Sequence, residues 1–330
     1  MKQLTIGTRA SKLALIQTNQ VIERLRHHWP DLEIAIEQIH TMGDRMRDVP
    51  LAQIGGDGVF VTEIEHALED RRIDVAVHSL KDLPTVQPAG LSIVVAGPRE
   101  DVRDVLVSRN CMGGQEAFDV HKVLHAAARI GTGSLRRMAQ LRAQYPVIQI
   151  LPLRGNVDTR LRKLESGEYD GIVLAAAGLH RMDIQERLAG RVHYFPFEFM
   201  MPAPGQGALA LEIRDEAEMR ALLAPLHDLR VRATTSAERI FMRHLGAGCY
   251  LPVAALGEIV NDTLTLTGLV ISLDGQQQVH VCQQMPWTAE TNIELVEQLG
   301  VKLAEQALAQ GAGTIIQNIN AMRTEERQHV

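Results

Sequence analysis

Cysteine is scarce in this chain of 330 residues, and its three cysteines have no paired spacing. Cys111, Cys249 and Cys282 are an odd number without a C-x-x-C motif, which argues against a disulfide framework and against a zinc knuckle. His121 and His125 are four residues apart but have no third ligand nearby in the sequence. The sequence therefore predicts no metal site, and a cysteine with a function is expected to act alone.

Long apolar runs, aromatic residues and excess positive charge are missing as well. No segment approaches the roughly 18 apolar residues of a membrane-spanning helix. The first residues lack the apolar core of a signal peptide, so we expect a cytoplasmic protein without a membrane partner. Aromatic residues make up 4% of the chain, too few for obvious base-stacking platforms, and the formal net charge is -6. No nucleic-acid partner is expected.

Positive charge is nevertheless concentrated in one stretch. Between residues 131 and 163, seven basic residues face a single acidic one, Asp158. The planar guanidinium group of arginine matches the oxygens of carboxylates and phosphates, so this cluster predicts a small polyanionic ligand. The seven basic residues are Arg136, Arg137, Arg142, Arg154, Arg160, Arg162 and Lys163.

The order of apolar and periodic segments predicts an α/β fold. Short β-type runs alternate with segments of helical period over residues 4–78, and a second such series covers residues 130–175. From about residue 229 the pattern changes to a helix, three extended segments and a final helix, which indicates a small C-terminal α+β domain. Residues 96–103 and 196–207 have hinge-like composition and lie between the two expected lobes.

Two strand-to-helix turns have the composition of an anion cradle. Ser134 precedes a helix that begins with two arginines, so it is expected to cap that helix where free backbone amides favour an acidic group. Arg9 and Ser11 repeat this arrangement after the first strand, at the kind of turn where open α/β sheets bind ligands. An equally open alternative is that both serines are only helix caps and that the arginines are solvated.

A third turn carries a candidate for catalysis. Lys81 and Asp82 directly follow the apolar strand at residues 73–77, and a carboxylate beside a lysine at a strand end is suited to catalysis. Periodicity alone favours a plainer alternative, in which Asp82 caps the turn before Pro84 and Lys81 is its surface partner. His78, taken alone, fits a buried core residue.

Cys249 lies in a glycine-rich loop at residues 246–252, after a helix expected to end near Leu245. Such a loop would let the sulfur reach outward from a small domain, whereas a buried, unreactive thiol is the plainer alternative. A helix C-terminus does not lower the pKa of a thiol, so reactivity would require nearby cations.

Five distinctive segments follow one another along almost the whole chain. They are residues 6–14 (IGTRASKLA), 74–84 (DVAVHSLKDLP), 131–137 (GTGSLRR), 153–157 (LRGNV) and 202–207 (PAPGQG). In this order they resemble the porphobilinogen deaminase family, also called hydroxymethylbilane synthase, of tetrapyrrole biosynthesis.

The resemblance implies the architecture. It implies two lobes like those of type II periplasmic binding proteins, joined by two crossing segments, and a small C-terminal α+β domain in a monomer. The first lobe is expected at residues 1–98 and 201–224, the second at 99–200, and the third domain at 225–330.

The resemblance also implies the chemistry, that of a transferase in porphyrin and heme biosynthesis. Cys249 would carry a dipyrromethane cofactor through a thioether bond. Four porphobilinogen molecules would be added to it in turn with loss of ammonia, and hydroxymethylbilane would then be released by hydrolysis. Asp82 matches the catalytic carboxylate of the family. The matching binding positions are Arg9, Ser11, Lys81, Thr132, Ser134, Arg136, Arg137, Arg154, Arg160 and Arg181.

The chain departs from the family pattern in one loop. The family usually has lysine where this chain has Asp57 and Thr62. A divergent homologue with impaired elongation or an altered product is therefore an alternative. A second alternative is a non-catalytic carboxylate-binding protein of the same fold, which would need neither Asp82 nor a thioether at Cys249.

Overall fold

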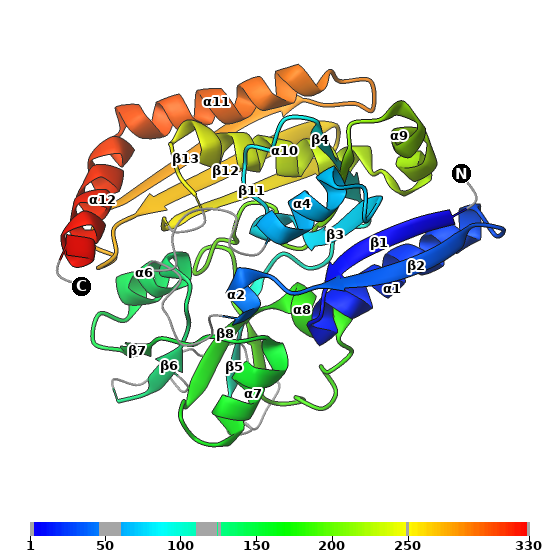
Figure 1. The fold of residues 1–330 in the computed structure, drawn as a ribbon. Helices are drawn as coiled ribbons and strands as arrows, with labels where there is room; N and C mark the ends of the chain where they lie inside the picture. Colours follow the sequence, from blue (N-terminus) through cyan, green and yellow to red (C-terminus); the bar gives the residue numbers. More distant parts are fainter. Residues whose placement is uncertain (1–2, 46–60, 110–123, 125–126, 249–250, 329–330) are drawn as a thin grey trace.

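The computed structural model describes residues 3–45, 61–109, 124, 127–248 and 251–328 (Figure 1). The described strands form three separate sheets, two of five strands and one of three. None of the described helices is long and apolar enough to cross a membrane. The described residues also contain no cluster of three His, Cys, Asp or Glu side chains that could hold a metal ion.

The first lobe is built on a five-stranded sheet in the order β2-β1-β3-β10-β4. Strands β1 (Gln3–Arg9), β2 (Glu33–Ile39) and β3 (Val75–Ser79) are parallel. Strand β10 (Leu209–Arg214) comes from much later in the chain and runs antiparallel between β3 and β4 (Leu91–Ala96).

Alternating side chains place helices on both faces of this sheet. Val75 and Val77 of β3 share a buried cluster with residues of α1, whereas Ala76 belongs to the cluster that contains residues of α4. The helices of this lobe are α1 (Lys12–His28), α2 (Met42–Arg45), α4 (Thr62–Glu69) and α9 (Ala217–Leu223).

The second lobe repeats the strand order of the first, as β7-β6-β8-β5-β9. Strands β7 (Gln149–Leu151), β6 (Arg129–Gly131) and β8 (Gly171–Ala175) are parallel, and β5 (Asp104–Ser108) runs antiparallel between β8 and β9 (Val192–Tyr194). Its helices are α6 (Leu135–Gln144), α7 (Val157–Glu165) and α8 (Ala176–Arg181).

In each lobe the antiparallel strand is the one next to a crossing segment. The chain passes from β4 of the first sheet to β5 of the second, and it returns from β9 to β10. The two crossings touch one another, because the N–H of Glu100 donates to the carbonyl of Gly207 at 3.0 Å. Gly207 has a φ of +85°, and a Cβ there would lie 2.3 Å from the Glu100 oxygen, so only glycine fits this approach.

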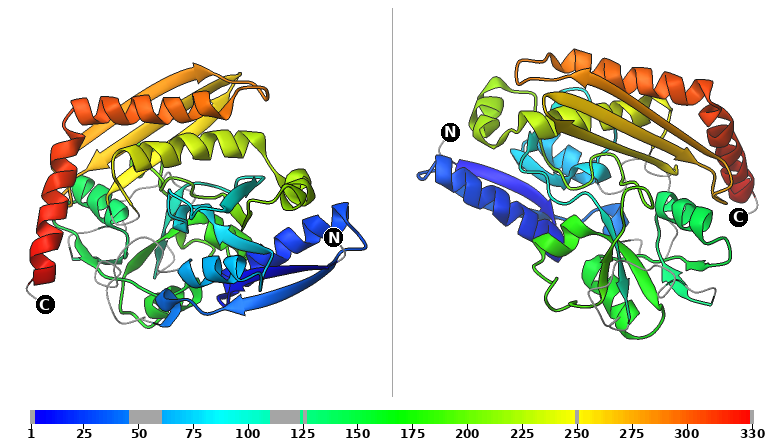
Figure 2. Two further views of the ribbon diagram at one scale, coloured as in Figure 1. Left: turned by 45° about the horizontal axis from the view of Figure 1, so that its top comes forward. Right: turned by 180° about the vertical axis from the view of Figure 1, so that it is seen from behind.

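The C-terminal domain is a three-stranded antiparallel sheet packed under helices. Its strands are β11 (Val253–Val260), β12 (Thr263–Ile271) and β13 (Gln278–Pro286). Helix α10 lies against β11 and α11 against β13, and the two helices pack side by side on one face of the sheet (Figure 2). The helices are α10 (Leu229–His244), α11 (Ile293–Ala309) and α12 (Ala312–Gln328).

These sheets confirm the predicted fold class of two type II periplasmic-binding-protein-like lobes and a small α+β domain. The predicted crossings at residues 96–103 and 196–207 lie where the chain changes sheets. Helix α10 begins at Leu229, because the Asp228 side chain accepts the N–H groups of Arg230 and Val231 and starts the helix there. The exact domain boundaries stay a prediction.

Candidate functional site

The predicted site residues follow the carboxyl ends of parallel strands in both lobes. In open α/β sheets this edge is where ligands bind, because the loops after neighbouring strands meet there. In the first lobe, Arg9 ends β1 and Ser11 follows it, and Lys81 and Asp82 follow β3. In the second lobe, the residues after β6 are Thr132, Ser134, Arg136 and Arg137, those after β7 are Arg154 and Arg160, and Arg181 ends α8 after β8.

Residues 80–84, here called the β3 turn, leave Asp82 exposed and Lys81 half-buried because their neighbours are buried. The turn is a short 3-10 helix, Leu80–Asp82, closed by a bond from the Leu83 N–H to the Leu80 carbonyl. Leu80 and Leu83 are 1% and 0% exposed, so they anchor the turn in the core. Asp82 lines a cavity of about 70 Å³ together with Arg9 and Ser11. Asp82 therefore lies beside the first anion-cradle turn.

His78, just before this turn, is a buried residue as its plainer interpretation expected. Its Nε2 lies 3.1 Å from Oε2 of Glu212 on β10, and both side chains are almost fully buried. Burial raises the pKa of the nearby Glu65, and the charge of Glu212 raises it further. His78 also lines the cavity that Asp82, Arg9 and Ser11 border, so it is a buried residue at the edge of the candidate site.

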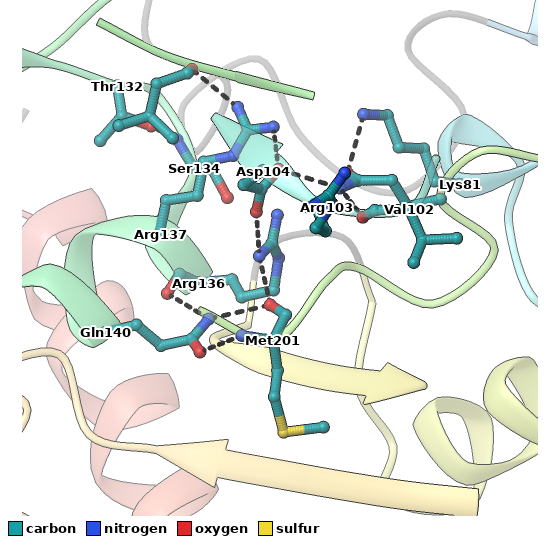
Figure 3. Close-up of polar contacts among 12 residues, drawn as sticks. Lys81, Val102, Arg103, Asp104, Thr132, Ser134, Arg136, Arg137, Gln140 and Met201 are labelled. Atoms are coloured by element: carbon teal, nitrogen blue, oxygen red, sulfur yellow. Dashed lines mark hydrogen bonds and ion pairs between the residues drawn. The ribbon is translucent and has the colours of Figure 1, made fainter. Parts of the chain in front are cut away.

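Asp104 is the centre of the polar network that joins the second lobe to the crossings (Figure 3). Its carboxylate is 0% exposed and lies 2.7 Å from Nη1 of Arg136 and 2.7 Å from Nη2 of Arg137. Burial alone would raise the pKa of Asp104, but the two arginines outweigh burial and hold that pKa well below its usual range. Arg136 also donates to the carbonyl of Met201 at 2.6 Å. Arg136 thus has a structural role that the sequence did not predict.

Gln206 connects this network to Lys81. Its amide nitrogen donates to Asp104 at 2.9 Å and to the Val102 carbonyl at 2.7 Å, which fixes the orientation of the amide. Its oxygen therefore faces Lys81, whose Nζ donates to it at 3.1 Å. Burial lowers the pKa of Lys81 to about 8, with Arg137 as the stronger of two nearby arginines that act in the same direction.

Three further arginines form no ion pair with a carboxylate in the part of the chain that the structure describes. Burial lowers the pKa of Arg160 to about 10, and repulsion from Arg137 adds to this effect although Asp82 opposes it. Burial lowers the pKa of Arg181 to about 10 as well. The Nη1 atom of Arg154 is buried without a hydrogen-bond partner among the described residues. Buried donors and crowded cations of this kind favour a bound anion.

The two serines at the cradle turns, Ser11 and Ser134, differ in whether their side chains cap the helix that follows. The hydroxyl of Ser11 accepts the N–H of Ala14 at 3.3 Å and caps α1. Ser134 occupies the N-cap position of α6, but its side chain makes no capping hydrogen bond, so the predicted cap is not formed. Instead, the backbone N–H of Ser134 donates to the hydroxyl of Thr132 at 3.2 Å. The N-terminus of α6 thus lacks the side-chain acceptor that the sequence predicted.

Two predicted features lie outside the described residues, namely Cys249 and Asp57. Helix α10, which precedes Cys249, ends at His244, and Gly246 has the left-handed φ of +64° expected at a helix end. Thr62 is the first residue of α4. A larger groove of about 600 Å³ lies between α10 and α11, and none of the predicted site residues lines it.

Family models match nearly all of the chain. The model described as porphobilinogen deaminase, dipyromethane cofactor binding domain, matches residues 4–221, which include both cradle turns and the β3 turn. The chain belongs to the porphobilinogen deaminase family. A second model, the C-terminal domain of porphobilinogen deaminase, matches residues 233–309. The family resemblance of the five sequence segments is thereby confirmed.

Similar proteins named porphobilinogen deaminase span the same length. That of Syntrophus aciditrophicus is 46% identical over 317 residues, covering 96% of this chain and 98% of its own. That of Deinococcus radiodurans is 44% identical over 322 residues, covering 97% and 99%. Among solved structures, a VFT2 domain of Bordetella pertussis BvgS covers 68% of this chain and 86% of its own with 13% identity and a TM-score of 0.42. A likeness at that level has no bearing on function.

Proposed function

We propose that this chain is an active hydroxymethylbilane synthase, which joins four porphobilinogen molecules with release of ammonia in tetrapyrrole biosynthesis. The observation that carries the proposal is the position of Asp82 beside Arg9 and Ser11, near enough to Arg160 of the second lobe for their charges to interact, in a chain of this family. We further propose that the enzyme is cytoplasmic and monomeric.

The hydrogen-bond donors at the candidate site fit the dipyrromethane cofactor of the family. Each pyrrole ring carries an acetate and a propionate, and the buried Nη1 of Arg154 is a donor suited to such a carboxylate. When bound through Cys249, the cofactor supplies the pyrrole terminus to which substrate is added. The residues proposed to bind its carboxylates or those of the growing chain are Arg9, Ser11, Lys81, Thr132, Ser134, Arg136, Arg137, Arg154, Arg160 and Arg181.

Asp82 is proposed as the catalytic group. Its carboxylate borders the cavity next to Arg9 and Ser11, where a pyrrole N–H can donate to it while the ring carboxylates meet the arginines. A carboxylate in this place stabilises the positive charge that develops as ammonia leaves, and it can take part in proton transfer. Arg136, held by Asp104 and Met201, contributes mainly by keeping the N-terminus of α6 in place.

Lys81 gives the first testable prediction, a loss of binding at alkaline pH. Because its pKa is about 8 in the folded protein, Lys81 loses its positive charge as the pH rises through that value, and attraction for a ring carboxylate is lost with it. The charged groups nearest Lys81 are Asp82, Asp104, Arg136 and Arg137. We expect kcat/KM for porphobilinogen to fall by about ten-fold per pH unit above this value.

The pH profile of Lys81→Arg is the matching control. Arginine stays protonated throughout this range, so the variant is expected to lack the alkaline limb near pH 8 even if its kcat is lower. Ionisation of porphobilinogen itself affects both proteins equally. An unchanged limb in Lys81→Arg would assign the titration to another group.

The intact mass of the purified protein tests the proposed function directly. The unsubstituted chain is expected to carry the mass of two pyrrole units beyond its sequence, and Cys249→Ser is expected to lack them. Addition of porphobilinogen should then add single pyrrole units in steps to the unsubstituted protein only. Cys282→Ser is the matched control, because Cys282 is a free, exposed thiol elsewhere in the C-terminal domain and should keep the two units.

The same measurement separates the alternatives. Two resident pyrrole units without further additions would indicate the divergent homologue with impaired elongation. An unmodified mass without additions would overturn the enzyme proposal and favour a carboxylate-binding protein. Retention of both units in Cys249→Ser would place the attachment elsewhere.

A further inference from the structure

Helix α10 of the C-terminal domain reaches across to the β3 turn through one side chain. Arg239 is 9% exposed, and its guanidinium donates to three backbone carbonyls of that turn. Nη1 lies 3.3 Å from the Leu80 oxygen and 3.1 Å from the Leu83 oxygen, and Nη2 lies 2.6 Å from the Pro84 oxygen. Three carbonyls that bracket Lys81 and Asp82 therefore share one donor group.

These contacts fix the backbone of the turn rather than its side chains. The Leu80 carbonyl also accepts the N–H of Leu83 within the turn, whereas the Leu83 and Pro84 carbonyls lie after the short helix, where their hydrogen-bond donors must come from outside it. The planar guanidinium holds its donors in a rigid fork, which defines the position of the turn more tightly than a single flexible donor would. The buried Leu80 and Leu83 hold the turn from the core, and Arg239 holds its carbonyls. Asp82 is positioned between these two restraints.

The residue next to Arg239 anchors α10 to both crossing segments. Glu238 is fully buried and accepts hydrogen bonds from Arg99 of the first crossing at 2.8 and 2.9 Å. It also accepts the N–H of Gly205, in the second crossing, at 2.7 Å. One turn of α10 thus touches the β3 turn and both connections between the lobes. Any displacement of this helix is transmitted to the site of Asp82.

We propose that Arg239 is a positioning residue of the active site, which sets the place of Asp82 through the backbone of the β3 turn. This inference rests on the proposed function. The inference implies that one helix fixes the positions of two separate parts of the active site relative to each other. Helix α10 holds the β3 turn at Arg239 and ends five residues before Cys249, so the same helix sets both the proposed catalytic carboxylate and the start of the loop that carries the cofactor.

The test compares cofactor-loaded holoenzymes of Arg239→Met, Arg239→Lys and the control Arg243→Met. Arg243 lies one turn further along α10 and is exposed, and among the described residues it makes no hydrogen bond or ion pair with the β3 turn or the crossings. We expect Arg239→Met to lower kcat by about 100-fold per loaded molecule, because a small displacement of a catalytic group has an effect of that size. The KM for porphobilinogen should change by less than about three-fold, since all the proposed binding arginines except Arg9 lie in the second lobe, and of the proposed binding residues only Lys81 belongs to the β3 turn.

Arg239→Lys keeps the charge and part of the hydrogen bonding, so it is expected to recover part of kcat while its thermal unfolding midpoint stays near that of the unsubstituted protein. If Arg239→Met does not fold, the kcat of Arg239→Lys tests the inference instead. Arg243→Met should keep kcat within about two-fold. If loaded Arg239→Met, or Arg239→Lys where the former is insoluble, keeps the unsubstituted kcat, the inference is overturned and Arg239 only stabilises the interface. Inactivity of the unsubstituted chain would instead overturn the proposed function.

Discussion

Asp82→Asn is expected to lower kcat for hydroxymethylbilane formation by about 100-fold to about 10,000-fold, the range typical of a lost general acid or base. The substitution keeps the shape of the side chain and removes its negative charge. The positive charge that develops as ammonia leaves would then face an amide dipole, with Arg160 and its neighbours still nearby. The transition state should lose far more stabilisation than the bound substrate.

Asp82→Glu separates charge from geometry. The longer side chain keeps the carboxylate but moves it by one methylene group from a backbone that Leu80 and Leu83 hold in the core. We expect an activity between those of the unsubstituted enzyme and Asp82→Asn, because the negative charge remains but its distance to the reacting atoms changes.

Single-turnover rates per cofactor-loaded molecule measure both effects, and intact mass gives the loaded fraction. Asp31→Asn is a matched control, because Asp31 is exposed in the turn before β2, at the opposite end of that strand from the site. It should leave the rate unchanged. A rate for Asp82→Asn within about ten-fold of the unsubstituted enzyme would show that Asp82 is not the general acid or base.

The part of the site that could be predicted from the sequence is local. Arg9, Ser11, Lys81 and Asp82 each lie within a few residues of a strand end. A turn that directly follows a strand in the sequence also lies next to that strand in the structure. Helix α6 begins directly after Ser134, where the sequence predicted a helix that opens with two arginines. These residues could therefore be assigned to the correct edge of a sheet without knowing which distant segments of the chain contact them.

The residues that the sequence did not reveal act over long separations. Asp104 and Arg136 are 32 positions apart, and Arg239 is 159 positions from Leu80. No helical or strand period relates such pairs. Strand β10 was not predicted from the sequence for a similar reason. It joins β3 and β4 of the first sheet only after the chain has passed through the second lobe and returned. A buried aspartate at the start of an apolar strand was the available signal for Asp104.

Asp104→Ala is expected to have the largest effect on stability, a loss of about 3–5 kcal/mol in the free energy of unfolding, because it leaves buried charges without a partner. The guanidinium groups of Arg136 and Arg137 are 5% and 7% exposed and would lose their common carboxylate. Gln206 would lose one of the two acceptors that orient its amide. Urea unfolding followed by circular dichroism measures the change.

Asp215→Ala is the surface control. Asp215 also pairs with an arginine, Arg220, but both side chains are about half exposed, so its loss should amount to less than about 1 kcal/mol. The contrast between the two variants tests whether burial, rather than the mere presence of an ion pair, makes Asp104 important.

Acid titration tests the role of the Asp104 charge independently of the surface control. Because Arg136 and Arg137 hold the pKa of Asp104 well below its unfolded value, the folded state favours the ionised carboxylate. The contribution of Asp104 to stability is therefore fully present above its unfolded-state pKa, at about pH 4. It is lost progressively as the pH falls from there through the lower, folded-state pKa. Asp104→Ala should remove this contribution, so the gap in stability between the two proteins should narrow as the pH falls below about 4. A gap that stays constant would mean that the loss comes from packing, and that the two arginines find other partners when Asp104 is absent.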